Sequence, residues 1–561
     1  MTKKETIFFA ATFVFVAVIN LLRANYLYTP IVDDAYIFLR YAENVVNGHG
    51  FVWNVGEQPV EGYTSFLYLV VIIIGKLLSL NLETYCIAIG IMSSSLTLYF
   101  AYLIYQNFIP VENDLSLENK ITVVIIALSP AFLYWSGAGM DTSFYSMFLV
   151  ITIYYFLKLP DSTRSLLLKG VLFGLLCVTR FEAVLFFLLA LYYLMRKEKS
   201  LIKIRINKSA VLFASGFTII FAAYFIWRWS YFGYFLPNTF YAKTGGGLKE
   251  ISAGFFYIIS SFRLFYGLGW ILLLFVLLFF KKNMLAGKAG LIFSFGLLSI
   301  LTTIMLGGDH FSFGRFVLPV FPLLFIVFPP ALNRMLSAQT KSLKIKPAFK
   351  LAVLLIILMT ILIVKSAYQQ SIGGFKNLLD GEKEIVTGVD KSTDEEIIEW
   401  QNGWILMGKA LKNIADKNDY IALVPIGAVG YYSKINVIDM VGIVDPVIAH
   451  EKYSPGLVKK WTAGHTKGDG KYILSRKPKY ILLTDYLTKR PLEKLYKRPM
   501  QFKSVIEIWT SEEFHREYEF YPVEVTKGWY CNLFKRKDQA IKDFLPEQTE
   551  FKSYEESLNS H

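Results

Sequence analysis

DDAYIFLRYAENVVNGHGFVWNVGEQPVEGYTS, residues 33–65, follows directly on an apolar N-terminal segment. At helical spacing, residues 35–47 divide into a polar and an apolar face, which is typical of a helix that lies in a membrane interface. Gly48 predicts the end of this helix. Two adjacent acids, Asp33 and Asp34, precede it. Charge beside a membrane is costly unless it is hydrated or used, so this pair is the first functional candidate.

The composition identifies a polytopic membrane protein. Hydrophobic residues make up 54% of the 561 residues, and the mean hydropathy is +0.43. Soluble domains average about 45–50% apolar residues, and the excess here is concentrated in long runs. The net charge of +14 sits largely in loops between these runs, which favours a positive-inside topology over nucleic-acid binding. Three widely separated cysteines indicate neither a disulfide framework nor a metal site.

About eleven apolar runs have roughly the length needed to cross a bilayer. The first is interpreted as a retained span, because no small-residue cleavage site precedes Tyr26. The run 66–80 is shorter and is interrupted by Lys76, so it is predicted to be an interfacial helix with a snorkelling lysine. The predicted spans are 6–24, 84–106, 121–137, 143–159, 165–179, 181–195, 209–228, 252–280, 289–306, 316–332 and 350–366.

The basic loops fix the predicted topology. All four lie on the same side of the membrane only if the run 66–80 does not cross it. They are Met1–Lys4, Arg196–Lys208, Lys281–Lys288 and Arg334–Lys350. The N-terminus is then cytoplasmic and the C-terminus lies outside. Residues 165–195 would make one helix about 46 Å long, with charged residues near the bilayer centre. A hairpin with Thr179–Glu182 at its tip avoids that cost.

Two domains are predicted. Residues 1–366 form a transmembrane α-helical module with juxtamembrane helices on its outer face at 33–80, and residues 367–561 form a soluble domain of α/β pattern. The pattern in the second domain predicts strands at Tyr420–Val424, Val437–Met440 and Tyr480–Thr484 and helices at Asp394–Lys417 and Leu492–Lys497. Asp439 and Asp445 are interpreted as shaping turns rather than as facing a substrate.

The distinctive polar residues fall in the predicted outer segments, whereas the inner loops hold only basic ones. Cations at a membrane surface suit a phosphate or pyrophosphate headgroup, and carboxylates suit deprotonation of a hydroxyl or hydrogen bonds to a sugar. No nucleotide-binding glycine loop and no metal-binding motif is present, which disfavours a nucleotide-sugar donor and leaves a divalent cation unsupported. The candidates are Asp33, Asp34, Glu61, Tyr63, Asp141, Arg180, Glu182, Lys243, Asp309 and Arg315.

Four segments in order resemble a known family. They are residues 33–68, SGAGMDTSF at 136–144, GGDHFSFGRFVLPVFP at 307–322 and IGAVGYYSKINVIDMVGIVDPVIAH at 426–450. Together they resemble bacterial membrane glycosyltransferases of the GT-C fold, and most of all the terminal arabinofuranosyltransferases of mycobacterial cell-wall assembly. His310, within the third segment, departs from the family pattern, and no family role is extended to it.

The resemblance implies a polyprenyl-phosphate-linked sugar donor and an active site on the outer face of a bacterial plasma membrane. It also implies that an acid of the first outer loop is the catalytic base, matched here by Asp33 and Asp34. Capping of helix 35–47 is the structural alternative for this pair, and between the two we favour Asp33 as the base. Adjacent carboxylates should raise the pKa of one of them.

The other candidates have structural alternatives as well. Arg180 and Glu182 could form an ion pair that closes the hairpin, and Asp141 could cap the helix after it. For Glu61 and Tyr63 a turn role competes with lining the site. Lys243 precedes three glycines that suggest a mobile loop, and it is assigned with Arg180 and Arg315 to the donor phosphate.

The leading hypothesis is transfer of a sugar, arabinofuranose or a related pentose or hexose, from a polyprenyl-phosphate donor to an extracytoplasmic glycan or glycolipid. One base and no evident nucleophile indicate inversion. Three alternatives remain: a transferase acting on protein or lipid A, a lipid-linked-sugar flippase and a carbohydrate-binding scaffold. A flippase would place charges at the bilayer midplane on broken helices, often in two related halves, and neither pattern is visible.

Overall fold

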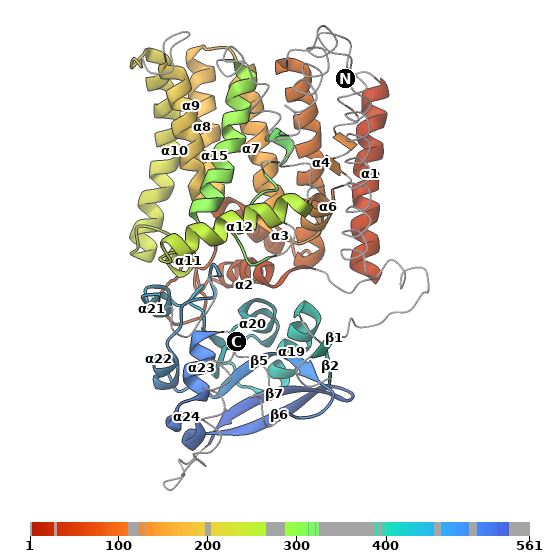
Figure 1. The fold of residues 1–561 in the computed structure, drawn as a ribbon, viewed down its shortest axis with the longest axis vertical. Coiled ribbons are helices and arrows are strands. Elements are labelled where there is room, and N and C mark those ends of the chain that lie inside the picture. Colours follow the sequence, from red (N-terminus) through yellow and green to blue (C-terminus); the bar gives the residue numbers. More distant parts are fainter. Residues whose placement is uncertain are drawn as a thin grey trace, which may run out of the picture.

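The protein consists of a helical bundle stacked end to end on a smaller mixed domain (Figure 1). The computed structural model describes residues 3–26, 31–109, 129–196, 204–264, 287–311, 314–319, 321–324, 388–390, 395–398, 400–453, 462–492 and 502–537, with five single positions between 120 and 127. Helices α2, α3, α11 and α12 lie across the end of the bundle that meets the smaller domain.

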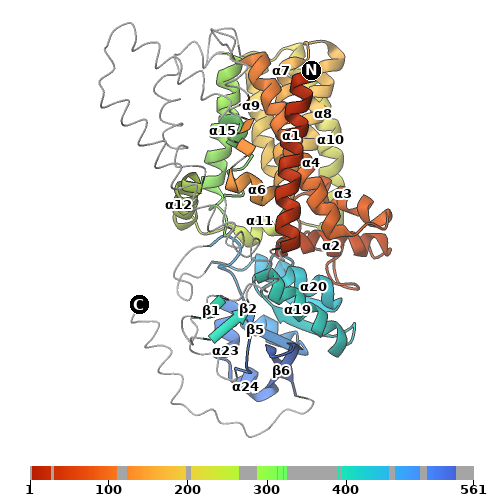
Figure 2. The ribbon, with the colours of Figure 1, turned by 90° about the vertical axis from the view of Figure 1, so that its right-hand side faces the viewer.

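The helices of the bundle run side by side (Figures 1 and 2). Among the described residues, α4, α10 and α15 are long and apolar enough to cross a membrane. The bundle helices are α1 (Lys3–Tyr26), α4 (Leu82–Phe108), α7 (Asp141–Lys158), α8 (Thr163–Thr179), α9 (Val184–Met195), α10 (Lys208–Phe232) and α15 (Lys288–Met305), with the short α6 (Pro130–Ser136) among them. Each of the seven longer helices overlaps one predicted span.

One predicted span takes a different direction. Helix α12 (Leu248–Leu264) covers the start of predicted span 252–280 but crosses the lower end of the bundle instead of running along it (Figure 1). Glu250 in its first turn is buried and accepts hydrogen bonds from the backbone N–H groups of Gly245 and Gly246. Most of predicted span 316–332 and all of 350–366 lie outside the described residues.

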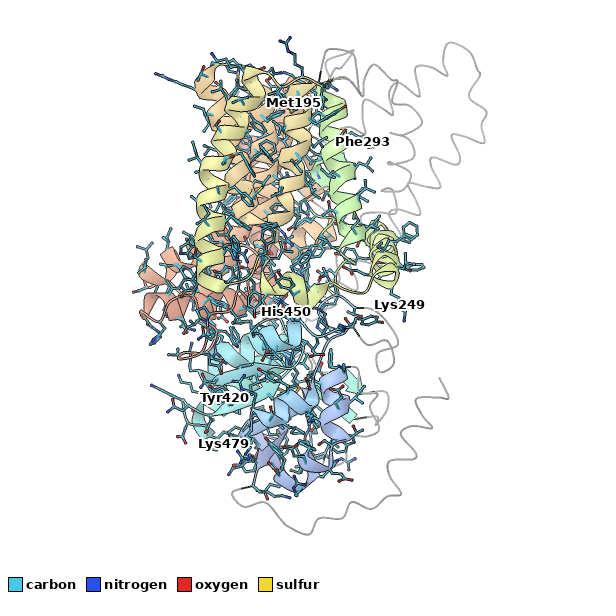
Figure 3. All side chains as sticks on the ribbon, turned by 90° about the vertical axis from the view of Figure 1, so that its left-hand side faces the viewer. Met195, Lys249, Phe293, Tyr420, His450 and Lys479 are labelled. Carbon is cyan, nitrogen blue, oxygen red and sulfur yellow. The ribbon has the colours of Figure 1, made fainter. Side chains whose placement is uncertain are left out.

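The predicted sidedness agrees with the arrangement of the described segments. Helix α1 begins at the end of the bundle far from the mixed domain, and Met195, at the start of a basic loop, lies at that same end (Figures 2 and 3). The Nζ of Lys288 donates to the carbonyl of Leu157 (3.1 Å), near Lys158 at the end of α7. Helix α2 (Asp33–Val46) and the mixed domain occupy the opposite end.

Helix α3 (Phe66–Leu77) does not cross the bundle, as the parity argument required. Twelve residues of helix extend about 18 Å, which is too short for a bilayer core. Lys76 near its end pairs with Glu43 of α2 at 2.9 Å instead of pointing freely into an interface. The ammonium group of Lys76, predicted to snorkel, thus has an acid partner.

The predicted hairpin at 165–195 is present. Helix α8 ends at Thr179, Arg180 has extended backbone angles (φ −149°, ψ 125°), and a single 3-10 turn (η1, Phe181–Ala183) leads into α9. The chain reverses at the end of the bundle that faces the mixed domain, since α9 ends at Met195 at the far end (Figure 3). The charged residues at the tip are thus kept out of the bundle interior.

The mixed domain contains a seven-stranded sheet among its described residues, with a main path of order β1-β2-β5-β3-β4. Parallel pairing joins β3 to β4 and to β5, while β5 pairs with β2 and β7 in antiparallel fashion, and β7 pairs with β6. The strands are β1 (Gly388–Asp390), β2 (Glu395–Ile398), β3 (Tyr420–Leu423), β4 (Asn436–Asp439), β5 (Tyr480–Thr488), β6 (Tyr518–Thr526) and β7 (Trp529–Arg536).

Short helices connect and cover these strands. Helix α20 crosses from β3 to its parallel neighbour β4 and faces the bundle (Figure 1). The helices are α19 (Trp400–Ile414), α20 (Ile426–Ser433), α21 (Pro446–Ala449), α22 (Gly470–Ser475), α23 (Lys503–Trp509) and α24 (Glu512–Glu517). The three predicted strands are confirmed. The helix predicted over 394–417 is shorter, because 395–398 pairs as β2, and the hairpin of β6 and β7 was not predicted.

Helix α2 is the meeting point of the two bodies. Residues 35–42 are all buried, and rings of α2 pack on α20, with Tyr36 5.6 Å from Tyr432 between ring centroids. The helix lies across the end of the bundle, as expected for the predicted interfacial helix, but its polar face is not open to solvent. Its polar face, including Arg40, is covered by the mixed domain, and its apolar face lies toward the bundle and α3.

Candidate active site

Asp33 binds the start of α20. Its Oδ1 accepts a hydrogen bond from the Ala428 N–H (2.7 Å), and its Oδ2 accepts one from the Gly427 N–H (3.0 Å). A carboxylate at the N-terminus of a helix satisfies free N–H groups and interacts favourably with the helix dipole. Asp33 does not cap its own helix, whose N-cap is Val32 without a side-chain hydrogen bond. The predicted cap of helix 35–47 is thus absent at this residue.

Arg40 binds the other end of α20. Its Nη1 donates to the carbonyl of Gly430 (2.8 Å), and its Nη2 donates to the carbonyl of Ile435 (2.9 Å). A cation suits the C-terminal carbonyls of a helix. Asp33 and Arg40 are two helical turns apart on α2, about 10 Å, which matches the eight residues of α20. We call these two side chains and α20 the clasp.

The clasp requires a close approach of two backbones. A Cβ atom at Gly427 would lie 2.0 Å from the backbone oxygen of Asp33. No side chain can occupy that space without moving one helix away from the other. The glycine therefore lets the first turn of α20 reach the carboxylate of Asp33, and the two domains meet here with fixed geometry.

Asp34 faces away from the clasp toward Arg315. The Nη1 of Arg315 lies 3.4 Å from Oδ2 of Asp34, whereas its Nη2 donates to Oδ1 of Asp309 at 2.9 Å. Arg315 and Asp309 are buried, but 30% of the Asp34 side chain is exposed. Asp34 can therefore meet a substrate, while Asp309 holds the guanidinium of Arg315 in place.

Arg180 brings two further acids to the same place. Its Nε donates to Oε1 of Glu182 at 2.7 Å, and its Nη1 lies 3.4 Å from Oδ2 of Asp141. The ring of Phe316 lies between the two guanidinium groups, 5.0 Å from that of Arg180 and 5.1 Å from that of Arg315. The predicted ion pair of Arg180 and Glu182 is confirmed. Asp141 starts α7 without capping it, because Met140 is the N-cap.

Lys243 ends α11 (Asn238–Lys243) and lies within electrostatic reach of Asp34, Asp309 and Arg315. Burial lowers the pKa of Lys243, and Arg315 lowers it further. Among the described residues its ammonium group has neither a hydrogen bond nor an ion pair. In the glycine segment after it, the N–H groups of Gly245 and Gly246 both donate to Glu250 at 3.1 Å.

We call Asp34, Asp141, Arg180, Glu182, Lys243, Asp309 and Arg315 the charged cluster. Four acids and three cations leave it with one formal negative charge when all are ionised. Burial favours a raised pKa for Asp309, but the opposing charges of Arg315, His310 and Lys243 hold that pKa below its usual range. The described residues contain no group of three or more His, Cys, Asp or Glu side chains arranged to hold a metal ion.

The pKa of Asp33 is raised chiefly by its burial. Burial raises this pKa to about 7, and the neighbouring charge of Asp34 is a smaller cause. Asp33 is also the acid that binds backbone N–H groups of α20.

Glu61 and Tyr63 belong to a different contact. Glu61 forms a buried ion pair with Arg228 of α10, whose Nε donates to Oε2 at 2.9 Å. Tyr63 packs edge-on against Tyr41 with ring centroids 5.0 Å apart. Among the described residues neither contacts a member of the charged cluster, and Glu61 instead holds the segment after α2 against α10.

Asp439 and Asp445 shape turns, as interpreted from sequence. The carboxylate of Asp439 accepts hydrogen bonds from the N–H groups of Val441 and Val444, both at 2.9 Å. Asp445 caps α21 by accepting from the N–H of Val447 at 3.0 Å. Neither carboxylate is directed at the charged cluster by these bonds.

Sequence reasoning missed one residue beside the cluster. His465, in the segment 462–469 of the mixed domain, lies with its ring 4.3 Å from that of His310. Asp34, Asp309 and Lys243 all act electrostatically on it. A lone histidine in a polar segment gives no sequence signal, and its approach to His310 depends on how the two domains dock.

Part of the mixed domain matches a family model. The model is described as a domain of unknown function, DUF8728, and it covers residues 395–530. No curated protein matches the sequence at a significant level.

Three solved structures are similar to the chain. ArnT from Cupriavidus metallidurans bound to undecaprenyl phosphate has 12% identity and a TM-score of 0.48, with 78% of this chain and 86% of that one covered. Arabinofuranosyltransferase AftD from Mycobacteria has 14% identity and a TM-score of 0.42, with 78% and 33% covered.

The third structure is the oligosaccharyltransferase AglB from Archaeoglobus fulgidus, with an inhibitory peptide and a dolichol-phosphate. It has 12% identity and a TM-score of 0.41, with 98% of this chain and 76% of that one covered. All three TM-scores lie below 0.5, and the function proposed below rests on this chain's own residues.

Proposed function

We propose that the protein transfers a sugar from a polyprenyl-phosphate donor to a hydroxyl of a glycan or glycolipid at the outer face of the membrane. The observation that carries the proposal is the partly exposed Lys243 ammonium group, which lies within electrostatic reach of Arg315 and has no ion pair among the described residues. An unpaired cation at the end of a membrane bundle suits a phosphate group that arrives from the lipid.

The donor phosphate is assigned to Lys243, Arg315 and Arg180. Arg315 is held from behind by Asp309, and Arg180 by Glu182, so each guanidinium is oriented before a substrate binds. Such fixed cations stabilise charge that develops on a leaving phosphate without reorganising. The apolar bundle beside the cluster supplies the surface along which a polyprenyl chain can lie.

Asp34 is assigned as the general base. It is the partly exposed acid of the pair and lies beside the proposed phosphate site, whereas Asp33 is engaged with α20. The acceptor oxygen attacks the anomeric carbon, and its proton passes to Asp34. The bond between that carbon and the phosphate oxygen breaks, releasing polyprenyl phosphate, and the single displacement inverts the anomeric centre.

Asp141 and Glu182 are assigned to substrate binding only through Arg180, which both contact. Glu61 and Tyr63 are better explained as structural residues. The sugar is arabinofuranose or a related pentose or hexose. With the basic loops in the cytoplasm, the charged cluster and the mixed domain face outward.

The test uses purified full-length protein in detergent or nanodiscs. Radiolabelled polyprenyl-phosphate sugars are supplied one at a time, with a panel of octyl glycosides and a cell-envelope extract as acceptors. We expect transfer from at least one donor, with release of polyprenyl phosphate in equal amount. Movement of the labelled lipid between leaflets without sugar transfer would contradict the proposal and support the flippase.

A further inference from the structure

The mixed domain reaches the charged cluster through segment 462–469. The Nζ of Lys467 in this segment is buried and donates to two carbonyls, those of Tyr241 (2.7 Å) and Ala449 (2.8 Å). Tyr241 belongs to α11, the helix that ends in Lys243. The segment is therefore fixed to the same helix that carries the free cation of the cluster.

Gly464 lies beside Lys243. It has φ +78°, and a Cβ atom there would lie 3.5 Å from Cγ and 3.6 Å from Cε of Lys243, which is ordinary contact distance. The stem of Lys243 is thus close to the segment. The next residue, His465, extends over the cluster and meets His310, whose neighbour Phe311 lies under the guanidinium of Arg315 at 4.7 Å.

The tautomer of His465 follows from its hydrogen bond. Its Nδ1 lies 3.1 Å from the carbonyl oxygen of Ala463, and because a carbonyl can only accept, Nδ1 carries the proton. Burial lowers the pKa of His465. The charge of Lys243 lowers this pKa further, whereas the charges of Asp34 and Asp309 raise it. The ring is then neutral near pH 7, and its Nε2 presents a lone pair. Among the described residues no group donates to that nitrogen.

We infer that His465 accepts a hydrogen bond from the acceptor sugar, so that the soluble domain contributes an acceptor-binding residue to the site. The attacking hydroxyl has one hydrogen, and Asp34 takes it in the proposed reaction. His465 therefore binds a different hydroxyl of the same sugar, and two points of attachment orient the attacking oxygen. The inference rests on the proposed function.

His465→Asn tests this role without releasing the segment. The amide nitrogen of asparagine can replace Nδ1 in the bond to Ala463, but asparagine has no group at the position of Nε2. Losing one hydrogen bond to the acceptor should raise the acceptor KM about five- to tenfold. The donor KM, the affinity for undecaprenyl phosphate and the melting temperature should stay at wild-type values. His465→Gln places an amide near the Nε2 position and should restore part of the loss.

His515 provides the matched control. It is another histidine of the mixed domain whose pKa burial lowers, and its Nε2 lies 2.7 Å from the carbonyl of Trp509 in the covering helices. His515→Gln should leave both KM values unchanged.

The outcomes separate the two proposals. If the wild type transfers sugar to an octyl glycoside and His465→Asn has the same acceptor KM, the inference fails and the proposed function stands. Equal changes in donor and acceptor kinetics would show a structural role and also overturn it. If the wild type transfers no sugar from any polyprenyl-phosphate donor, both fail.

Discussion

The clasp and the charged cluster begin at neighbouring residues of α2, yet they use charge in opposite ways. In the clasp, Asp33 and Arg40 are buried and form hydrogen bonds to backbone groups at the two ends of α20. In the cluster, Asp34 is partly exposed and Lys243 has no partner among the described residues. Satisfied buried charges fix a structure, whereas accessible or unpaired ones are available to a substrate.

The substitution with the largest expected effect is Asp34→Asn, which tests whether the charged cluster serves catalysis. Loss of a general base should lower kcat about 10²–10⁴-fold, because a carboxamide cannot accept the proton. The melting temperature should not change, since the polar contact of Asp34 with other described residues is one long one, to Arg315. Initial rates at saturating donor measure the effect. Turnover close to that of wild type would remove Asp34 from catalysis.

The second variant is Lys243→Met, which keeps the length of the side chain and removes the charge. We expect the donor KM to rise about 10–100-fold, since a charge-assisted contact to phosphate is lost. The protein should not be destabilised, because no described carboxylate loses an ion pair. Lys249→Met on α12 is the control, as that lysine is exposed at the edge of the molecule (Figure 3). An equal effect of both changes would contradict a specific phosphate site.

The clasp should respond in stability instead of rate. Asp33→Ala leaves the N–H groups of Gly427 and Ala428 buried without an acceptor, which should cost about 2 kcal/mol of unfolding free energy. Thermal unfolding in detergent gives the measurement. Asp469→Ala removes an ordinary cap from α22, whose Tyr472 N–H it binds at 2.8 Å, and should cost about 1 kcal/mol. If Asp33→Ala abolishes turnover in folded protein, that result would contradict the structural role of Asp33 and its separation from the catalytic role of Asp34.

The last prediction is a pH dependence of stability. The pKa of Asp33 is about 7 in the folded protein and near 3.9 in an unfolded chain. Between these values the folded state holds more protons, so the unfolding free energy falls as pH rises from about 4 to about 7. Asp439, with a pKa also raised to about 7 by burial, acts in the same direction.

Asp33→Asn should make this slope shallower without removing it, because Asp439 still contributes. Unfolding midpoints at pH 5, 6 and 7 for variant and wild type give the comparison. Identical slopes would show that Asp33 keeps the same protonation in both states.

The sequence predicted the membrane class and most of the described spans, because a long apolar run is stable in a bilayer as a helix that spans it. The hairpin at Arg180 and the non-crossing 66–80 followed from the cost of buried charge and from the basic loops. The orientation of α12 was not predictable, since its apolar character suits both a span and a helix at the end of the bundle. Hydropathy alone does not separate these.

The sequence predicted the members of the site but not the separate roles of those members. Asp33 and Asp34 look alike in sequence, and about 100° of helix rotation between neighbours sends one to α20 and the other to Arg315. The sequence analysis favours Asp33 as the base, but Asp33 is the first residue of α2 and binds the start of α20. Arg40 and His465 act across the domain boundary, so no local pattern could reveal them.

Asn54, in the segment after α2, covers part of the edge of the sheet, which bears on association between copies of the chain. Its amide accepts from the N–H of Val437 (2.9 Å) and donates to the carbonyl of the same residue (3.0 Å), as a neighbouring strand would. Val437 lies in β4, the last strand on the main path of the sheet. A free sheet edge invites pairing between molecules. The mixed domain produced without residues 31–65 would expose that edge, so it should associate into β-linked oligomers that the full chain does not form.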